Sequence, residues 1–169
     1  EITLSAPFGA NFRLTAKYDL IAIKPGAEII LYDWKTYAKR PKDEFLAARW
    51  QTRIYRALMI QAGTLLFGNT PIEPEFLTMV YWFAEYPTQP ARFPYSNAQY
   101  ARDTNALDSL VDEIATSTDF PKTEEEKKCS YCIYRSYCDR KVTIGDNLFL
   151  EDDPAELEIN LEQIQEIAF

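Results

Sequence analysis

Apolar and polar positions alternate imperfectly over the first part of the chain. Residues 11–24, NFRLTAKYDLIAIK, are rich in residues that favour β-strands, and the stretch 28–37, EIILYDWKTY, has the same character. Pro25 and Gly26 lie between the two stretches and supply a turn. The pattern therefore predicts two adjacent strands joined as a hairpin.

The spacing of apolar positions changes in the next segment, RPKDEFLAARWQTRIYRALMIQAG. Residues of one face recur every three to four positions, which is the period of a helix. They are Phe45, Ala48, Thr52, Tyr55, Met59 and Ala62. Asp43 can cap the amino end of this helix and Gly63 can close its carboxyl end. We expect one helix of about 20 residues.

Two more strands and a second long helix are predicted after this segment. Residues 76–86, FLTMVYWFAEY, read as a buried strand, and 91–100 as a strand cut short by Pro94. Residues 98–118 have the spacing of an amphipathic helix, and a short helix is expected over 134–141. The order strand, strand, helix, strand, strand, helix predicts an α/β sheet with helices packed on it.

The composition is that of a folded protein. The chain has 169 residues, of which 47% are apolar and 14% aromatic, enough for one domain with a core. We predict a domain over residues 1–150 and an acidic tail over 151–169, whose apolar residues are spaced for a helix. No apolar run approaches the roughly 20 residues needed to cross a bilayer, and no signal peptide opens the chain. The expected location is the cytoplasm, with no membrane partner.

Charge is distributed unevenly. The seven acids of residues 151–169 account for most of the net charge of −8, whereas residues 35–56 hold seven basic residues against two acids. A polyanion responds to such a local basic surface rather than to the total charge. A solvated helix face would show the same pattern. The candidate phosphate contacts are Lys39, Arg40, Arg49, Arg53 and Arg56.

An acid and an amine share one side of the second predicted strand. Asp33 and Lys35 project to one face and Trp34 to the other, because side chains alternate along a strand. Asp19 interrupts an apolar segment that the hairpin brings beside Asp33. Two neighbouring carboxylates suit Mg²⁺ or Mn²⁺. Two alternatives are open: Asp33 and Lys35 as a solvated strand end, and Asp19 as a salt-bridge partner of Lys35 or Arg13.

The helix that follows adds Gln51 and Tyr55, which lie four residues apart and hence on one face. The full set in chain order is Asp19, Asp33, Trp34, Lys35, Gln51 and Tyr55. This set resembles the core of the PD-(D/E)XK nucleases, specifically the RecB-like type. The resemblance implies a restriction-endonuclease-like α/β fold, with a central mixed β-sheet flanked by helices.

The resemblance also implies a catalytic role for each residue. Asp19, Asp33 and the backbone carbonyl of Trp34 would bind Mg²⁺ or Mn²⁺, which polarises a phosphodiester and activates water. Lys35 would orient that water or stabilise negative charge. Two further catalytic residues complete the set: Gln51 would position the site or the scissile strand, and Tyr55 would brace the helix or touch the DNA backbone.

Three cysteines near the carboxyl end, Cys129, Cys132 and Cys138, are similar to the iron-sulfur clasp of AddB-like and CRISPR-associated members of this group. Four thiolates would hold a [4Fe-4S] cluster or zinc, so a fourth ligand would lie outside this chain. The upstream His of many members is also missing. The resemblance then implies a chain that lacks the first helix of its domain, or a divergent member with other ligands. Packed, metal-free cysteines are the alternative.

The expected function is that of a metal-dependent DNA nuclease, an exonuclease acting on single strands or duplex ends. The resemblance places it in DNA repair, recombination or phage defence, with a helicase or other repair or CRISPR proteins as partners. The alternative is a catalytically inactive nuclease-like module that binds DNA or scaffolds a helicase-nuclease complex. An iron-sulfur redox protein explains the core residues less well.

Overall fold

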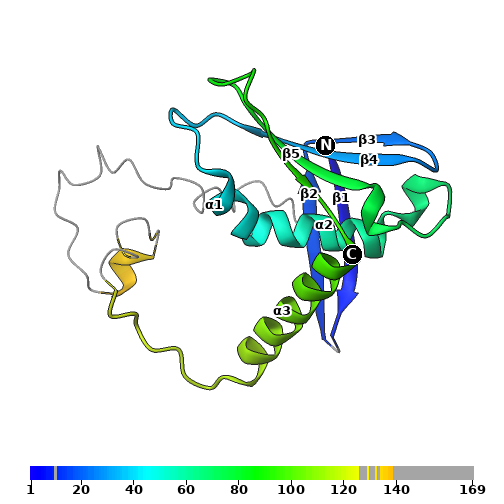
Figure 1. The fold of residues 1–169 in the computed structure, drawn as a ribbon. Helices are drawn as coiled ribbons and strands as arrows, with labels where there is room; N and C mark the ends of the chain where they lie inside the picture. The colour runs from blue at the N-terminus through cyan, green and yellow to red at the C-terminus, as the bar shows by residue number, and fades with distance from the viewer. Residues whose placement is uncertain (10, 126–128, 130–131, 133, 139–169) are drawn as a thin grey trace. The chain divides into compact units, whose positions relative to one another are not determined.

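The computed structural model describes residues 1–9, 11–125, 129, 132 and 134–138. The chain divides into two compact units, Glu1–Ser117 and Thr118–Phe169. The predicted boundary at residue 150 and the predicted helix of the acidic tail lie outside the described residues, so both stay predictions. The first unit contains all the strands and α-helices discussed below (Figure 1).

Six strands in the described residues form two sheets. They are β1 (Ile2–Phe8), β2 (Phe12–Tyr18), β3 (Leu20–Lys24), β4 (Glu28–Lys35), β5 (Leu77–Phe83) and β6 (Ala91–Pro94). β1 and β2 form an antiparallel hairpin, and the other sheet has the order β3-β4-β5-β6. In that sheet β4 and β5 run parallel, whereas the β3-β4 and β5-β6 pairs are antiparallel. The mixed sheet confirms the predicted fold class.

The helices of the first unit follow β4 and β6. The α-helices are α1 (Asp43–Ala48), α2 (Trp50–Ala62) and α3 (Asn97–Thr116), and the short 3₁₀ helices are η1 (Thr64–Phe67) and η2 (Pro74–Phe76). Helix α2 contacts α1, α3, the β1-β2 hairpin and β5, and Figure 1 shows it running across the sheet. Within the described residues, no helix combines the length and apolar character that a membrane span needs.

Several of the expected elements differ from the observed ones. The strand predicted over residues 11–24 is interrupted by a bend at Asp19, which separates β2 from β3. The pairing of β1 with β2 was not predicted. In the second unit, 3₁₀ helix η3 spans Arg135–Cys138 in place of the longer helix expected over 134–141, part of which lies outside the described residues.

The predicted long helix is broken at Arg49, whose backbone is extended with φ −61° and ψ 142°. In a continuous helix the carbonyl of Leu46 would accept the N–H of Trp50. It accepts instead the N–H of Arg49 and the hydroxyl of Thr52, so the helix turns aside at this point. Asp43 was expected as the cap but is the first helical residue, and Lys42 precedes it.

Gly63 ends α2 as predicted, for a packing reason. Its backbone is right-handed, with φ −85°, so no unusual conformation requires glycine. A Cβ here would clash with Sδ of Met59 and lie 2.5 Å from the Met59 backbone carbonyl oxygen and 3.0 Å from Cδ1 of Ile72. Close approach of the chain to the helix therefore excludes a side chain.

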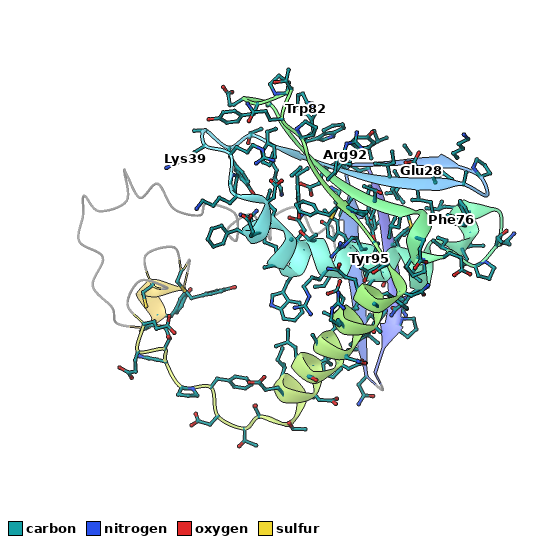
Figure 2. All side chains as sticks on the ribbon, viewed as in Figure 1. Glu28, Lys39, Phe76, Trp82, Arg92 and Tyr95 are labelled. Carbon is teal, nitrogen blue, oxygen red and sulfur yellow. The ribbon has the colours of Figure 1, made fainter. Side chains whose placement is uncertain are left out.

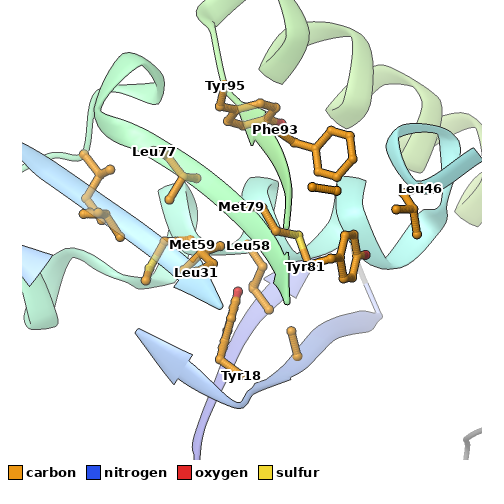
Figure 3. Close-up of a cluster of buried hydrophobic side chains, with 14 of the residues drawn as sticks. Tyr18, Leu31, Leu46, Leu58, Met59, Leu77, Met79, Tyr81, Phe93 and Tyr95 are labelled. Atoms are coloured by element: carbon orange, nitrogen blue, oxygen red, sulfur yellow. The ribbon is translucent and has the colours of Figure 1, made fainter. Parts of the chain in front are cut away.

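The core lies between α2 and one face of the four-stranded sheet (Figure 3). Leu31 of β4 is paired with Met79 of β5, and Leu58 and Met59 of α2 belong to the same buried cluster. Each of these side chains is at most 1% exposed. Burial of one such side chain stabilises the fold by about 1.5 to 3 kcal/mol, so α2 is fixed firmly on the sheet.

Helix α2 is joined to α3 by a buried charged cluster. Arg56 is 1% exposed, and its Nη2 lies 3.3 Å from Oδ2 of Asp103 on α3. Arg53 Nε donates to Oδ1 of the same carboxylate at 2.8 Å, and the hydroxyl of Tyr95 donates to Oδ2 at 3.2 Å. Tyr95 also lies under the guanidinium of Arg56, at 4.4 Å.

This cluster corrects one part of the sequence analysis. Arg56 was predicted to contact phosphates, with a solvated helix face as the alternative, but it is buried and paired with Asp103. Arg53 is paired with the same carboxylate at 2.8 Å and stacks on Trp50 at 4.3 Å. The regular spacing of these arginines therefore reflects helix packing, and Arg56 is wrong as a DNA contact.

Replacement of Asp103 tests this account. Asp103→Ala should lower the free energy of unfolding by about 3 to 5 kcal/mol, because it leaves the buried charge of Arg56 without its partner. Urea unfolding measures the change. Asp108→Ala is the matched control, since Asp108 lies on the same helix but is exposed, and its effect should stay within about 0.5 kcal/mol. Equal losses for the two variants would contradict the account.

Candidate active site at the end of strand β4

Asp33 and Lys35 point into the protein from the end of β4. Asp33 is 5% exposed, and its Oδ2 lies 2.9 Å from Nζ of Lys35. Trp34, between them, points to the opposite face, stacks against Tyr32 and lies edge-on to Trp82. The expected alternation of faces is confirmed, and the Asp33-Lys35 pair is a buried ion pair rather than a solvated strand end.

Gln51 joins this pair from the first turn of α2. Its amide Nε2 donates to Oδ1 of Asp33 at 2.6 Å, and its Oε1 accepts from Nζ of Lys35 at 3.1 Å. The assigned orientation of the amide suits both neighbours, since the donor faces the carboxylate and the acceptor faces the ammonium. We call Asp33, Lys35 and Gln51 the Asp33 cluster.

Asp19 reaches the same strand end from the bend between β2 and β3. Its Oδ2 accepts the backbone N–H of Trp34 at 2.8 Å. Of the two salt-bridge partners considered for it, Lys35 pairs with Asp33 and Arg13 donates to Ser5 at 3.1 Å. Asp19 therefore binds the backbone N–H of Trp34, in place of the salt bridge to Lys35 or Arg13 that the sequence left open.

Tyr55 lies one turn after Gln51 and braces α2 against the hairpin. Its ring centroid is 4.9 Å from that of Tyr18, whose hydroxyl donates to the Tyr55 carbonyl at 2.8 Å. Burial raises the pKa of the Tyr55 hydroxyl, and a hydrogen bond with Gln51 opposes this. The structure therefore brings Tyr55 beside the Asp33 cluster through Gln51.

The ionisation of the cluster is governed by burial. Burial raises the pKa of Asp33; Lys35 and Gln51 oppose that rise, while the charge of Asp19 adds to it. Burial alone would lower the pKa of Lys35, but its ion pair with Asp33 outweighs this and raises it. Lys35 is therefore held in its charged form, and ionised Asp33 is in an environment that favours a further cation.

The arrangement fits a divalent cation. Oδ2 of Asp33 is buried and accepts no well-directed hydrogen bond, its neighbour being the ammonium of Lys35. The N–H and C=O of one strand residue face the same neighbouring strand, so the Trp34 carbonyl lies on the side of Asp19. Two carboxylates and a carbonyl are hard oxygen donors, and Mg²⁺ completes such sets with water or phosphate. In the described part of the chain, no three His, Cys, Asp or Glu side chains gather into a possible metal site.

A family model described as the PD-(D/E)XK nuclease superfamily matches residues 1–139. The chain belongs to this superfamily. Its members are nucleases that usually use divalent metals, which agrees with the oxygen donors at the end of β4. No curated protein and no solved structure matches the chain.

The basic residues expected to surround the candidate site are held in different ways. Lys39 is exposed on the loop after β4 and points away from the sheet (Figure 2). Arg49 is half-buried and donates to the hydroxyl of Tyr37 at 3.2 Å. Arg40 is bound to the Gln89 carbonyl at 2.8 Å and to Asp43 at 2.6 Å. No continuous basic stripe follows α2.

Two aromatic residues of the candidate site were missed in the sequence. Nζ of Lys35 lies 5.3 Å from the ring centroid of Tyr81 and 5.7 Å from that of Tyr37. Tyr37 continues the spacing of two from Asp33 and Lys35, which is a usable signal. Tyr81 is opposite Asp33 in the β4-β5 register, a pairing that the sequence does not reveal.

The three cysteines lie in the second unit, and none of them forms a disulfide. The N–H of Cys132 donates to the carbonyl of Cys129 at 3.3 Å, and Cys138 ends η3. Among the described residues, which include all three thiols, no three His, Cys, Asp or Glu side chains lie close enough together to hold a metal ion. An iron-sulfur or zinc role for them stays a prediction.

Replacement of Gln51 tests the support of the buried carboxylate. Gln51→Leu should lower the free energy of unfolding by about 1 to 3 kcal/mol at about pH 7, because Asp33 loses its donor. The folded-state pKa of Asp33 would then rise further. The loss should therefore be complete above the folded-state pKa of Asp33 and shrink as the pH falls through that pKa towards the unfolded value of about 4.

Urea unfolding with a chelator present measures this loss at both pH values. The matched control is Gln61→Leu, an exposed glutamine on the same helix. Equal midpoints for the two variants at both pH values would show that the Gln51 amide gives the carboxylate no support.

Proposed function

We propose that this chain is a divalent-metal-dependent nuclease that hydrolyses phosphodiester bonds in DNA. The observation that carries the proposal is the Asp33 cluster itself, in which an acid, a lysine and a glutamine from two elements contact one another beside Asp19. A buried ion pair is a costly way to stabilise a fold, because apolar residues of similar volume do as well or better. A catalytic role therefore explains the presence of the cluster better than a stabilising role does.

Each residue of the site has a proposed role that follows from its chemistry. Asp19, Asp33 and the Trp34 carbonyl would hold the ion, which when bound polarises the phosphodiester and lowers the pKa of a water. Lys35 carries a charge fixed by Asp33 and Gln51, so its ammonium can donate to the attacking water or to a phosphate oxygen. Gln51 keeps both groups in place.

Substrate contacts are proposed for the basic residues that the structure leaves accessible. Lys39 is exposed and Arg49 is half-buried, and both can contact phosphates without reading sequence. The charges of Arg40 and Arg53 are offset by the carboxylates of Asp43 and Asp103, which would weaken their contacts with phosphates. The preferred substrate is single-stranded DNA or the end of a DNA duplex. The chain would act on it as an exonuclease in DNA repair, recombination or phage defence.

The finer assignments rest on the resemblance. These are the AddB-like or CRISPR-associated branch, a [4Fe-4S] cluster on the three cysteines with a fourth ligand from elsewhere, a helicase or CRISPR partner, and a cytoplasmic location. The spacing of Cys129, Cys132 and Cys138 supports the proposed clasp, and the three form no disulfide.

One observation favours a second candidate, an inactive nuclease-like module that binds DNA or scaffolds a larger complex. The described residues offer two carboxylates and one carbonyl to a metal, without a third acidic or histidine ligand beside them. Metal binding and cleavage separate the two candidates.

Cleavage of DNA should depend on the Asp33 cluster. With Mg²⁺ or Mn²⁺ present, Asp33→Asn and Lys35→Met should each lower the rate of DNA hydrolysis by about 100-fold or more, because each removes a group that acts on the reacting phosphate. Lys24→Met, an exposed lysine on β3, is the control and should cleave like the unaltered chain. Hydrolysis of labelled single-stranded and duplex DNA measures the rates, and circular dichroism verifies the fold. Unchanged cleavage in both cluster variants would overturn the proposed site.

Metal should stabilise the chain through Asp19 and Asp33. At about 100 times its dissociation constant, Mn²⁺ should add about 2.7 kcal/mol, which raises the melting temperature by about 5 to 10 °C. Asp19→Asn and Asp33→Asn should abolish most of the rise, as followed by thermal denaturation. An equal rise in both variants would place the metal elsewhere, and no rise in the unaltered chain would favour the inactive module.

A further inference from the structure

Tyr37 lies between two cations at the candidate site. Its ring centroid is 5.7 Å from Nζ of Lys35, and its hydroxyl accepts a hydrogen bond from Nη1 of Arg49 at 3.2 Å. The residue has no role in the assignments above. It nonetheless contacts the proposed catalytic lysine and one of the two accessible phosphate contacts.

The aromatic environment of Lys35 restricts its ammonium. Nζ lies 5.3 Å from the centroid of Tyr81 and 5.7 Å from that of Tyr37, both within the range of a cation-π interaction. The Lys35 side chain is 14% exposed, so little water competes. The oxygens of Asp33 and Gln51 hold the ammonium of Lys35 on one side. The rings of Tyr37 and Tyr81 limit its movement in the other directions.

Arg49 is held by the hydroxyl rather than by the ring. Its guanidinium carbon lies 5.8 Å from the Tyr37 centroid, near the limit for a cation-π contact, whereas the hydrogen bond is 3.2 Å long. Arg49 is the extended residue between α1 and α2. The break in the helix thus turns this side chain away from the stripe of Arg53 and Arg56, and towards Tyr37.

Tyr37 is itself anchored. Its ring packs on Phe83, with centroids 6.3 Å apart and an angle of 46° between the rings, and Phe83 is fully buried. Tyr37 follows Lys35 by two residues, so it continues the inward side of β4 just beyond the end of the strand. A side chain fixed in this way can serve as a rigid support for both cations.

We propose that Tyr37 is a positioning residue with two separable parts. The ring restricts the ammonium of Lys35 for the chemical step. The hydroxyl directs Arg49 towards a phosphate of the bound DNA next to the scissile bond. This inference rests on the proposed nuclease function and names two further determinants of that same site.

Two substitutions separate the parts. Tyr37→Phe keeps the ring and removes the acceptor, so KM for DNA should rise by about fivefold while kcat changes by less than about twofold. Tyr37→Leu removes both parts, so kcat should also fall by about tenfold. A KM and kcat unchanged in both variants would overturn the proposal, as would an equal loss of kcat in both.

A double-mutant cycle tests whether the hydroxyl acts through Arg49. Arg49→Gln should raise KM, and adding Tyr37→Phe should then raise it no further, because the two residues act as one unit. Independent, multiplying effects would contradict the proposed path. Tyr86→Phe is the matched control: its hydroxyl donates to the Ala38 carbonyl at 2.9 Å, and kinetics should be unaffected by its loss.

A measurement without substrate distinguishes this inference from the proposed function. Aromatic rings shift the NMR resonances of protons above them, so the ε-methylene protons of Lys35 should resonate at unusual positions. The shift should persist in Tyr37→Phe and move towards the ordinary lysine value in Tyr37→Leu. If the unaltered chain fails to cleave DNA, the proposed function is wrong, yet this shift still tests the contact. Identical Lys35 spectra in all three proteins would refute it.

Discussion

A carboxylate buried at the end of β4 has to be compensated, and that requirement organises the candidate site. Desolvation disfavours the ionised form of Asp33, so the fold surrounds it with the ammonium of Lys35 and the amide of Gln51. The compensation is incomplete, because Oδ2 accepts no well-directed hydrogen bond and Asp19 adds a second negative charge nearby. The charge of Asp33 is thus only partly compensated within the protein, and the PD-(D/E)XK superfamily, to which the chain belongs, usually uses divalent metals.

Helix α2 supplies the Gln51 part of this compensation and depends on packing over its whole length. Its apolar residues bind it to the sheet, and the buried pair of Arg56 and Asp103 binds it to α3. The break at Arg49 sets the start of the helix, so that Gln51 faces Asp33 from the first turn. One helix therefore couples the stability of the core to the geometry of the site.

Much of the fold and of the candidate site was predictable from local sequence patterns. The rest depends on contacts between residues that are far apart in the sequence. The β3-β4 hairpin, β5 and the opposed faces of Asp33 and Trp34 follow from apolar runs and alternation. The break at Arg49 was not visible, because it depends on the Thr52 hydroxyl taking a backbone carbonyl that a helix would use. The burial of Arg56 was missed because its partner, Asp103, lies 47 residues further along the chain. The contact of Tyr81 with Lys35 likewise follows from the pairing of β4 with β5.

Site-resolved binding of Mn²⁺ tests the central claim most directly, because a paramagnetic ion broadens the NMR signals of the nuclei closest to it. The account predicts that the amides of Asp19, Asp33 and Trp34 broaden first and together, and that Asp33→Asn removes the effect. Broadening that begins instead among the acidic residues 151–169, or that is unaltered in Asp33→Asn, would contradict the assignment of a metal-dependent nuclease site to the end of β4.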